Sequence, residues 1–304
     1  MVSLISASLQ ASQLSTRWKS RRFVLVSTAF VHAVPGTLLE EKLVDLRGFD
    51  PMELYRDAVA DGRWAAKAMR ELGFPNTYTF AKAVGEHLVE RSCVAAKVDL
   101  HIVRPSIVGP AWATPYAGWS GDRPSTVVGG AALLAGRGMR VFRASPHPCP
   151  LVPVDMVAEA TIDAVAGPQK AGLSITQATM DSSEAEKMPS WHLIQEILFQ
   201  TLALRGDMPL PEVGLLLRLL RWADTEKVFR VLHLAVNVAP NCLAVALTAF
   251  GLRVASSLGL DSRRWEERHK TASSLHRLSR LPVQYLPFTS SPRAWRFSSG
   301  RRLP

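Results

Sequence analysis

Two short, almost entirely apolar runs stand out in the hydrophobic pattern of the first half of the chain, at residues 22–31 and 98–110. Both are rich in valine, leucine and isoleucine, which predicts strands buried on both faces of a parallel sheet. A helix is expected between them, after the turn at residues 74–76, and another is expected after Asp155, a suitable N-cap residue. The pattern therefore predicts an α/β domain over residues 1–170.

The second part of the chain, residues 171–304, is predicted to be mainly helical. It opens with a polar connector at residues 171–189. A helix follows, which Pro209 and Pro211 end. One face of this helix is expected to carry apolar residues at helical spacing: Trp191, Ile194, Ile197, Leu198 and Leu202.

One stretch of the helical part, residues 231–252, has no charge apart from His233 and is long enough to cross a bilayer. Asn237, Pro240 and Asn241 lie in its middle and are expected to divide it into two short apolar pieces. A kinked or paired element on a membrane surface is the favoured interpretation. A buried pair of soluble helices and a true membrane span are the alternatives.

The most informative chemistry lies in the helix between the two strands, where Tyr78 and Lys82 are four residues apart. This spacing places both side chains on one helix face, about 5–6 Å apart at Cβ. A lysine ammonium beside a phenol lowers the tyrosine pKa from its reference value of about 10. The pair thus predicts a phenol that exchanges a proton with a carbonyl oxygen near neutral pH. The motif alone is common on ordinary helix surfaces, so the residues around it determine whether a catalytic role is indicated.

Those neighbours are polar residues where the two strands end. Ser27 and Thr28 come at the carboxyl end of the first strand, where open α/β sheets bind ligands. The second strand runs into Arg-Pro-Ser-Ile-Val at residues 104–108. The order along the chain is therefore a strand with Ser-Thr, a helix with Tyr-x-x-x-Lys, and a strand with Arg-Pro-Ser-Ile-Val.

This order resembles that of the extended short-chain dehydrogenase/reductases, and within them the fatty acyl-CoA reductases of the male-sterility type. The resemblance is strong over residues 22–166 and moderate over residues 231–298. The matching phrases are Val-Ser-Thr-Ala-Phe-Val at 26–31, Tyr-Thr-Phe-Ala-Lys at 78–82, Arg-Pro-Ser-Ile-Val at 104–108, Gly118-Trp119, Leu151 to Val157, and an aromatic ending from Tyr285 to Phe297. The resemblance implies the C-terminal part of a Rossmann-type parallel sheet domain followed by a mainly helical domain.

The resemblance also implies an enzyme of lipid biosynthesis that uses NADPH to reduce long-chain fatty acyl-CoA to an aldehyde and then to a fatty alcohol. Tyr78 is expected to donate the proton to the developing oxyanion, and Lys82 to assist it and hold the nicotinamide ribose. Thr28 is expected to bind the substrate oxygen, with Ser27 as the less favoured neighbour. Besides Tyr78 and Lys82, the expected cofactor contacts are Pro105, Ser106, Ile107 and Val108.

The sequence departs from this family in one respect. No strand is followed by Gly-x-x-Gly-x-x-Gly, the arrangement that holds the cofactor pyrophosphate, and the glycines at 129–130 and 136–138 lie downstream of both strands. We expect the chain to be part of a longer reductase and to bind NADPH weakly by itself; a natural short form is the alternative. Two other functions stay open: a non-catalytic, membrane-associated remnant, and another extended reductase or epimerase acting on nucleotide sugars or steroids.

Charge narrows the choice of partners. The net charge is +10, and from Arg253 onward eleven Lys/Arg residues stand against three acidic ones. This basic tail suits an anionic membrane surface or the phosphates of coenzyme A, and no nucleic-acid-binding motif accompanies it. The expected partners are therefore a long-chain acyl-CoA and a membrane surface, reached through residues 231–252 and the tail; a second copy of the chain is kept open. We expect an intracellular, membrane-associated protein.

Composition bears on the class of protein, on its redox compartment and on metal binding. A hydrophobic content of 47% with 20% charged residues excludes a disordered chain. The three cysteines, Cys93, Cys149 and Cys242, are widely spaced and suit a reducing compartment. Neither they nor the eight scattered histidines show metal-ligand spacing, so no metal is expected.

Overall fold

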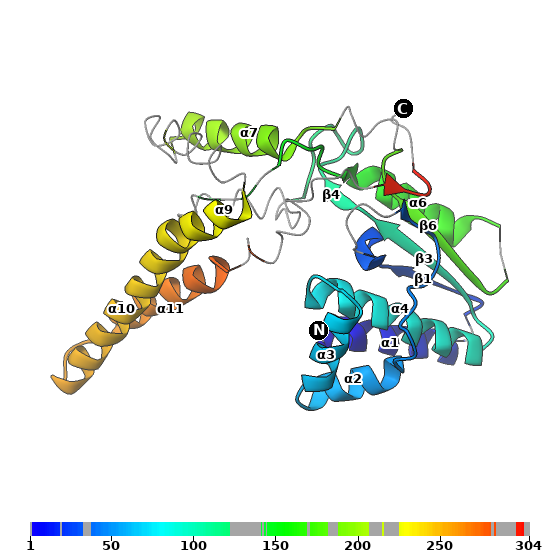
Figure 1. The fold of residues 1–304 in the computed structure, drawn as a ribbon, viewed down its shortest axis with the longest axis horizontal. Helices are drawn as coiled ribbons and strands as arrows, with labels where there is room; N and C mark the ends of the chain where they lie inside the picture. The colour runs from blue at the N-terminus through cyan, green and yellow to red at the C-terminus, as the bar shows by residue number, and fades with distance from the viewer. Residues whose placement is uncertain are drawn as a thin grey trace. The chain divides into compact units, whose positions relative to one another are not determined.

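A computed structural model gives the fold of the chain (Figure 1). It describes residues 2–18, 20–32, 38–121, 141, 143, 145–168, 171–181, 188–206, 215, 225–280, 283 and 296–300. The chain forms two compact units. The sheet unit comprises Met1–Thr126, Cys149–Met188 and Arg293–Pro304, and the helical unit comprises Val127–Pro148 and Pro189–Pro292.

A parallel sheet organises the sheet unit. Its strands are β1 (Arg22–Val26), β3 (Asp99–Pro105) and β6 (Leu173–Ala178), in the order β1-β3-β6. Leu25 of β1 pairs with Ile102 of β3, which pairs in turn with Ile175 of β6. The two apolar runs therefore form neighbouring parallel strands, as their pattern predicts, and the chain has the expected α/β fold.

Strand β6 lies where the sequence predicts a polar connector, and that prediction is wrong. The strand can contain polar side chains because these have hydrogen-bond partners within the fold. The side-chain amide of Gln177, 2% exposed, donates to the carbonyl oxygen of Leu39 at 2.6 Å. Its backbone N–H donates to the Glu41 carboxylate at 2.7 Å. The sheet thus continues past residue 170, where the sequence places a domain boundary; the division into domains 1–170 and 171–304 stays a prediction.

Helices pack on both faces of the sheet (Figure 1). Successive residues of β3 point to opposite faces, so Ile102 packs with Val89 of one helix and Val103 packs with Val157 of another. The helices concerned are α4 (Thr77–Ala95) and α6 (Val154–Ala166). Three further helices pack against α4 or one another: α1 (Val2–Arg17), α2 (Pro51–Ala60) and α3 (Arg63–Glu71).

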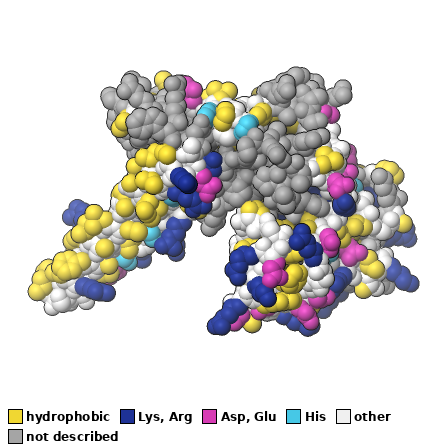
Figure 2. Space-filling model, in the orientation of Figure 1, with side chains coloured by type: hydrophobic (Ala, Val, Ile, Leu, Met, Phe, Trp, Pro, Cys, Tyr) yellow, Lys and Arg dark blue, Asp and Glu magenta, His cyan; other side chains and the backbone are white. Residues whose placement is uncertain are grey.

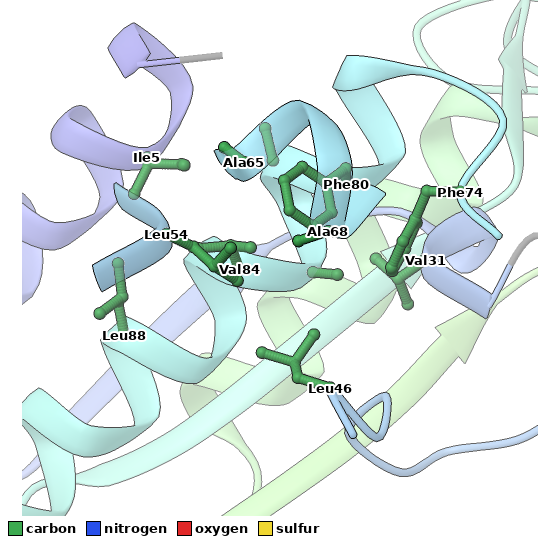
Figure 3. Packing of buried hydrophobic residues seen from close by; sticks show 12 residues of the cluster. Ile5, Val31, Leu46, Leu54, Ala65, Ala68, Phe74, Phe80, Val84 and Leu88 are labelled. Atoms are coloured by element: carbon green, nitrogen blue, oxygen red, sulfur yellow. The ribbon is translucent and has the colours of Figure 1, made fainter. Parts of the chain in front are cut away.

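Helix α4 supplies an apolar face around which these helices assemble (Figure 3). Phe80, Val84 and Leu88 recur every four residues and are between 1% and 2% exposed. They belong to one cluster with residues from α1, α2 and α3, namely Ile5, Leu54, Ala65 and Ala68. Full burial of a phenylalanine side chain contributes about 1.5–3 kcal/mol, so this cluster firmly fixes α4 in place.

The start of α4 is fixed by the turn that the sequence predicts there. The Asn76 Oδ1 accepts a hydrogen bond from the backbone N–H of Thr79 at 2.9 Å, which caps the helix. Phe74 lies edge-on to Phe80, with ring centroids 5.3 Å apart. The first turn of α4, which carries Tyr78, is therefore held at both its cap and its buried side.

Two short parallel pairs complete the sheet unit. β2 (Leu38–Leu39) pairs with β7 (Arg296–Phe297), and β4 (Ile107–Gly109) pairs with β5 (Leu151–Pro153). Several sequence features lie outside the described residues: the glycines at 129–130 and 136–138, Pro209 and Pro211, and all of the aromatic ending 285–297 before residue 296.

The helical unit begins with α7 (Trp191–Leu204), the helix expected after the connector. Its buried face comprises Trp191, Gln195, Leu198, Phe199 and Leu202. Ile197, which the sequence places on that face, is 52% exposed instead. Phe199 takes the buried position because it lies on the same side of the helix as Gln195 and Leu202.

Residues Glu226–Ser257 form one continuous helix, so the predicted division of residues 231–252 is wrong. A π-helical turn, η3 (His233–Val238), joins α9 (Glu226–Leu232) to α10 (Ala239–Ser257). The wider π turn precedes Pro240, which falls in the first turn of α10, where a proline N–H is not required. Asn237 does not interrupt the helix either, because its amide donates to the carbonyl oxygen of Val141 at 2.7 Å.

A second helix, α11 (Arg263–Leu278), packs against α10 to form a helical hairpin. The ring of Trp265 on α11 packs against the backbone of Gly251 on α10, in the space that a side chain would need. One turn earlier, the Thr248 hydroxyl hydrogen-bonds His269 Nδ1 at 3.1 Å. The hairpin is thus joined by both close packing and polar contacts.

Candidate active site

Lys82 reaches the carboxyl end of β1. Its Nζ donates a hydrogen bond to the carbonyl oxygen of Val26, the last residue of that strand, at 3.2 Å. Burial lowers the pKa of Lys82, and the carboxylate of Glu86 one turn further along α4 opposes this effect. The lysine of the sequence motif therefore lies at the sheet edge where ligands bind in open α/β folds.

Tyr78 is the second residue of α4 and lies one turn before Lys82 on the same helix face. Its side chain is 45% exposed, in contrast to the buried Phe80. The N–H groups at a helix N-terminus favour negative charge nearby. A phenol at this position is accessible to a ligand.

Two hydroxyl side chains follow β1. Thr28 is 4% exposed, and its Oγ1 accepts a hydrogen bond from the backbone N–H of Phe30 at 3.4 Å. The backbone N–H of Ser27 donates to Val103 at 2.8 Å, which extends the β1–β3 pairing. The Ser27 hydroxyl is buried and has no hydrogen-bond partner within the described residues. The hydroxyl that lacks a partner thus belongs to Ser27, although the sequence favours Thr28 over Ser27 for binding the substrate oxygen.

A second buried hydroxyl without a partner in the described part of the chain belongs to Ser106, between β3 and β4. The backbone here is held from two sides: Ser106 N–H donates to Ala178 at 3.3 Å, and Ile107 N–H donates to Pro150 at 3.0 Å. Pro105 and Ile107 are buried, and Val108 is half-buried. The predicted cofactor wall is therefore a rigid segment that presents one unsatisfied hydroxyl.

A buried ion pair that the sequence analysis did not identify ties α4 to β3. Arg104 donates to both carboxylate oxygens of Glu86, at 2.6 and 3.0 Å, and the two side chains are 0% and 1% exposed. The same guanidinium donates to the carbonyl oxygens of Glu40 and Lys42. A bidentate pair of this kind fixes geometry as well as charge. It therefore sets the position of the helix turn that follows Lys82.

Asp155 has a different role from the N-cap that the sequence predicts. Pro153 occupies the cap position, and Asp155 lies within the first turn of α6. Its carboxylate accepts hydrogen bonds from three consecutive backbone N–H groups, of Trp112, Ala113 and Thr114, at 2.8–3.0 Å. Burial raises the pKa of Asp155, but these donors outweigh burial and lower it to about 2. Asp155 thus holds the loop after β4.

The residues at the carboxyl ends of the neighbouring strands β1 and β3 suit a polar ligand with several hydrogen-bonding groups. Lys82 supplies a cation, and Ser27 and Ser106 supply buried hydroxyls that need partners. These groups fit the amide and ribose hydroxyls of a nicotinamide nucleoside. The prediction that Thr28 and Tyr78 reach the same carbonyl oxygen stays a prediction. No cluster of three metal-ligating side chains occurs in the described residues.

The sequence matches an NAD-binding family described as "Male sterility protein" over residues 5–161, more than half of the chain. This segment contains β1, α4 and β3 with all the site residues described above.

Curated relatives match over shorter segments. Fatty acyl-CoA reductase 1 of Xenopus laevis is 42% identical over 94 residues, which cover 30% of this chain and 17% of that protein. Fatty acyl-CoA reductase 2 of Bos taurus is 32% identical over 167 residues, or 51% of this chain and 29% of that protein. The chain thus spans well under half the length of these relatives.

Solved structures resemble the chain more distantly. A UDP-glucose 4-epimerase from Thermotoga maritima, solved with UDP-glucose, gives a TM-score of 0.34 at 16% identity, over 57% of this chain and 46% of that one. The terminal R domain of the myxalamid biosynthetic pathway gives 0.34 at 18% identity, over 66% and 47%.

Proposed function

We propose, for a chain that belongs to the Male sterility protein family, that it takes part in the nicotinamide-dependent reduction of fatty acyl-CoA. The observation that carries the proposal is the position of Lys82 at the carboxyl end of β1, where its Nζ donates to Val26, together with two buried hydroxyls that have no partner in the described residues, Ser27 after β1 and Ser106 after β3. The relatives named fatty acyl-CoA reductase support the substrate class. We further propose long-chain acyl groups, NADPH as the reductant and the alcohol as the final product, formed through the aldehyde.

The proposed roles are those that the resemblance to the family implies. Bound NADPH supplies the hydride that reaches the carbonyl carbon. Tyr78 donates its proton to the carbonyl oxygen as negative charge develops there, and Thr28 donates a hydrogen bond to the same oxygen. Lys82 stabilises the phenolate that remains and holds a ribose hydroxyl. These roles use the one helix face that Tyr78 and Lys82 share.

The proposed cofactor contacts include the rigid segment from Pro105 to Val108. Its apolar side chains would form a wall for the nicotinamide ring, and the buried Ser106 hydroxyl, which has no partner in the described residues, would hydrogen-bond the carboxamide. The Arg104–Glu86 pair holds this wall and α4 in a fixed relation. The segment therefore orients the nicotinamide ring and takes no part in the transfer of the hydride or the proton.

We also propose an intracellular protein that associates with an anionic membrane surface through its helical unit. Helix Glu226–Ser257 is long and apolar enough to cross a membrane, and only 11% of its most apolar stretch is buried. Figure 2 shows hydrophobic side chains along the helical hairpin, beside clusters of basic ones. An apolar face with flanking cations is typical of interfacial helices. The second copy of the chain considered as a partner stays a prediction.

The test of the reductase function uses the chain fused behind a strand and helix with Gly-x-x-Gly-x-x-Gly. Palmitoyl-CoA and NADPH are supplied, and NADPH oxidation and the lipid products are followed. The Tyr78→Phe variant removes the proton donor but keeps the ring. Its turnover is expected to fall by about 10²–10⁴-fold, the usual contribution of general acid catalysis.

The matched control is Tyr55→Phe, which changes a partly buried tyrosine of α2 in the core cluster and should keep turnover. Replacing NADPH with NADH tests the cofactor separately. Normal turnover of Tyr78→Phe would remove the reductase role from the Tyr78–Lys82 pair. Absence of any NADPH oxidation by the fused protein would contradict the proposed reaction itself.

A further inference from the structure

A cysteine, a histidine and an arginine meet on the helical hairpin, in the helical unit. Cys242 lies near the start of α10, is exposed, and has its Sγ 3.5 Å from Nδ1 of His276 on α11. The other ring nitrogen of His276 lies 3.1 Å from Nη2 of Arg280. Residues 34 positions apart in sequence are thus joined in one polar chain.

The direction of these hydrogen bonds follows from the donor groups. A guanidinium only donates, so the Nε2 of His276 accepts from Arg280 and the ring proton lies on Nδ1. That proton points at the sulfur of Cys242. A donated N–H stabilises the thiolate, which is the nucleophilic form of cysteine.

The other two cysteines lie in different surroundings. Cys93 and Cys149 are 1% and 0% exposed, and burial raises the pKa of both thiols, that of Cys93 to about 11. Both are therefore inert toward external electrophiles. Cys242 alone of the three combines exposure with a donor to its sulfur.

An apolar stripe begins beside Cys242 and follows α10. Leu243, Leu247, Phe250 and Val254 recur at helical spacing and are 60%, 58%, 67% and 37% exposed. Figure 2 shows hydrophobic side chains running along the helical hairpin. Exposed basic residues of α11 and of the turn after it accompany the stripe, among them Arg277 and Arg280 near His276. A ligand that suits this surface has an electrophilic carbon, a long apolar tail and negative charges.

We propose that Cys242 is an acyl-acceptor site, which takes a long-chain acyl group from an acyl-CoA. The thiolate sulfur bonds to the carbonyl carbon, and the bond from that carbon to the coenzyme A sulfur breaks. Coenzyme A leaves as its thiolate and takes a proton from water, so one thioester replaces another without oxidation or reduction. The acyl chain then lies on the stripe of Leu243, Leu247 and Phe250. The choice of acyl-CoA as donor rests on the proposed function.

The experiment incubates the full chain with palmitoyl-CoA below its micelle-forming concentration and measures intact mass, followed by peptide mapping. One palmitoyl group per chain is expected, on Cys242, removable by hydroxylamine. His276→Gln should slow the acylation by about tenfold or more, because the sulfur loses a charge-assisted donor. The matched control is His269→Gln, which changes the same helix interface but contacts Thr248 instead, and should acylate normally.

Three further variants separate the parts of the proposal. Leu243→Gln with Leu247→Gln should slow palmitoylation but not acetylation by acetyl-CoA, whereas Leu258→Gln, beyond the end of α10, should change neither. Tyr78→Phe should acylate normally, so failure of the reductase function leaves this result unaffected.

Three results would overturn the site: equal rates for His276→Gln and the folded wild type, equal rates for the urea-unfolded chain, or label on Cys93 or Cys149. Circular dichroism of each variant shows whether it has kept its helices.

Discussion

Helices α4 and α10 are both 19 residues long, and each has an apolar face, yet they are used in opposite ways. In α4 the buried residues run from Thr79 to Cys93, whereas in α10 Ala255 alone is buried. The packed helix holds Tyr78 and Lys82 against a sheet edge with little freedom. In α10, by contrast, the apolar stripe that begins at Leu243 is exposed and can contact a surface outside the hairpin. The comparison teaches that hydrophobic composition alone does not decide whether a helix positions a site or forms a surface.

The largest expected difference between the two helices comes from truncating a phenylalanine in each. Phe80→Ala on α4 should lower the free energy of unfolding by about 3–5 kcal/mol, because it leaves a cavity in the core cluster. Phe250→Ala on α10, where the ring is 67% exposed, should change it by less than about 0.5 kcal/mol. Urea denaturation of both variants measures this, and equal losses would abolish the distinction between the helices.

A comparable effect is expected from the buried charge that anchors α4. Arg104→Met leaves the Glu86 carboxylate buried without its partner, which should cost about 3–5 kcal/mol of unfolding free energy. Adding Glu86→Leu removes the stranded charge and should restore much of the loss. Denaturation curves of the single and double variants test this. A double variant as unstable as the single one would show that lost packing, and not the unpaired charge, causes the destabilisation.

A smaller, pH-dependent effect is expected at Asp155, which holds the loop after β4. Its pKa in the folded protein, about 2, lies below the ordinary value of 3.8, so its contribution is present above about pH 4 and is lost as the pH falls toward 2. After allowance for solvent screening, Asp155→Asn should cost about 1–2 kcal/mol at neutral pH. The gap between wild type and variant, measured by urea unfolding across this range, should close in acid. A gap independent of pH would contradict the role of the charge.

The sequence predicted the parts of the site that depend on local pattern. The strands at 22–26 and 99–105 are apolar runs, and the Tyr78–Lys82 spacing is a property of one helix, so both were visible without the fold. Contacts between distant segments were not. Nothing in the local pattern pairs Arg104 with Glu86 or places Asp155 against the loop at residues 112–114.

The remaining misses share a physical cause. Polar residues within an apolar pattern predict exposure or a break, but this fold supplies them with hydrogen-bond partners. Gln177 is buried in β6 because Leu39 and Glu41 bind it, and Asn237 is buried because Val141 does. The helix 226–257 continues past Pro240 because a π turn precedes it. The sequence shows that α10 is rich in apolar residues, but it does not show that these residues are exposed.

The smallest expected effect concerns the charges beside that stripe. If α10 and α11 contact an anionic membrane surface, each exposed cation of α11 should contribute about 1 kcal/mol. Arg264→Gln should therefore weaken binding to phosphatidylserine-containing vesicles about fivefold, and the difference should shrink as salt is raised. Arg56→Gln, an exposed arginine of α2 in the sheet unit, is the matched control and should bind as the wild type does. Vesicle sedimentation measures both. Equal binding to neutral and anionic vesicles would show that the apolar stripe acts without the basic residues, whereas equal weakening by Arg56→Gln would assign the contact to overall charge instead of the hairpin.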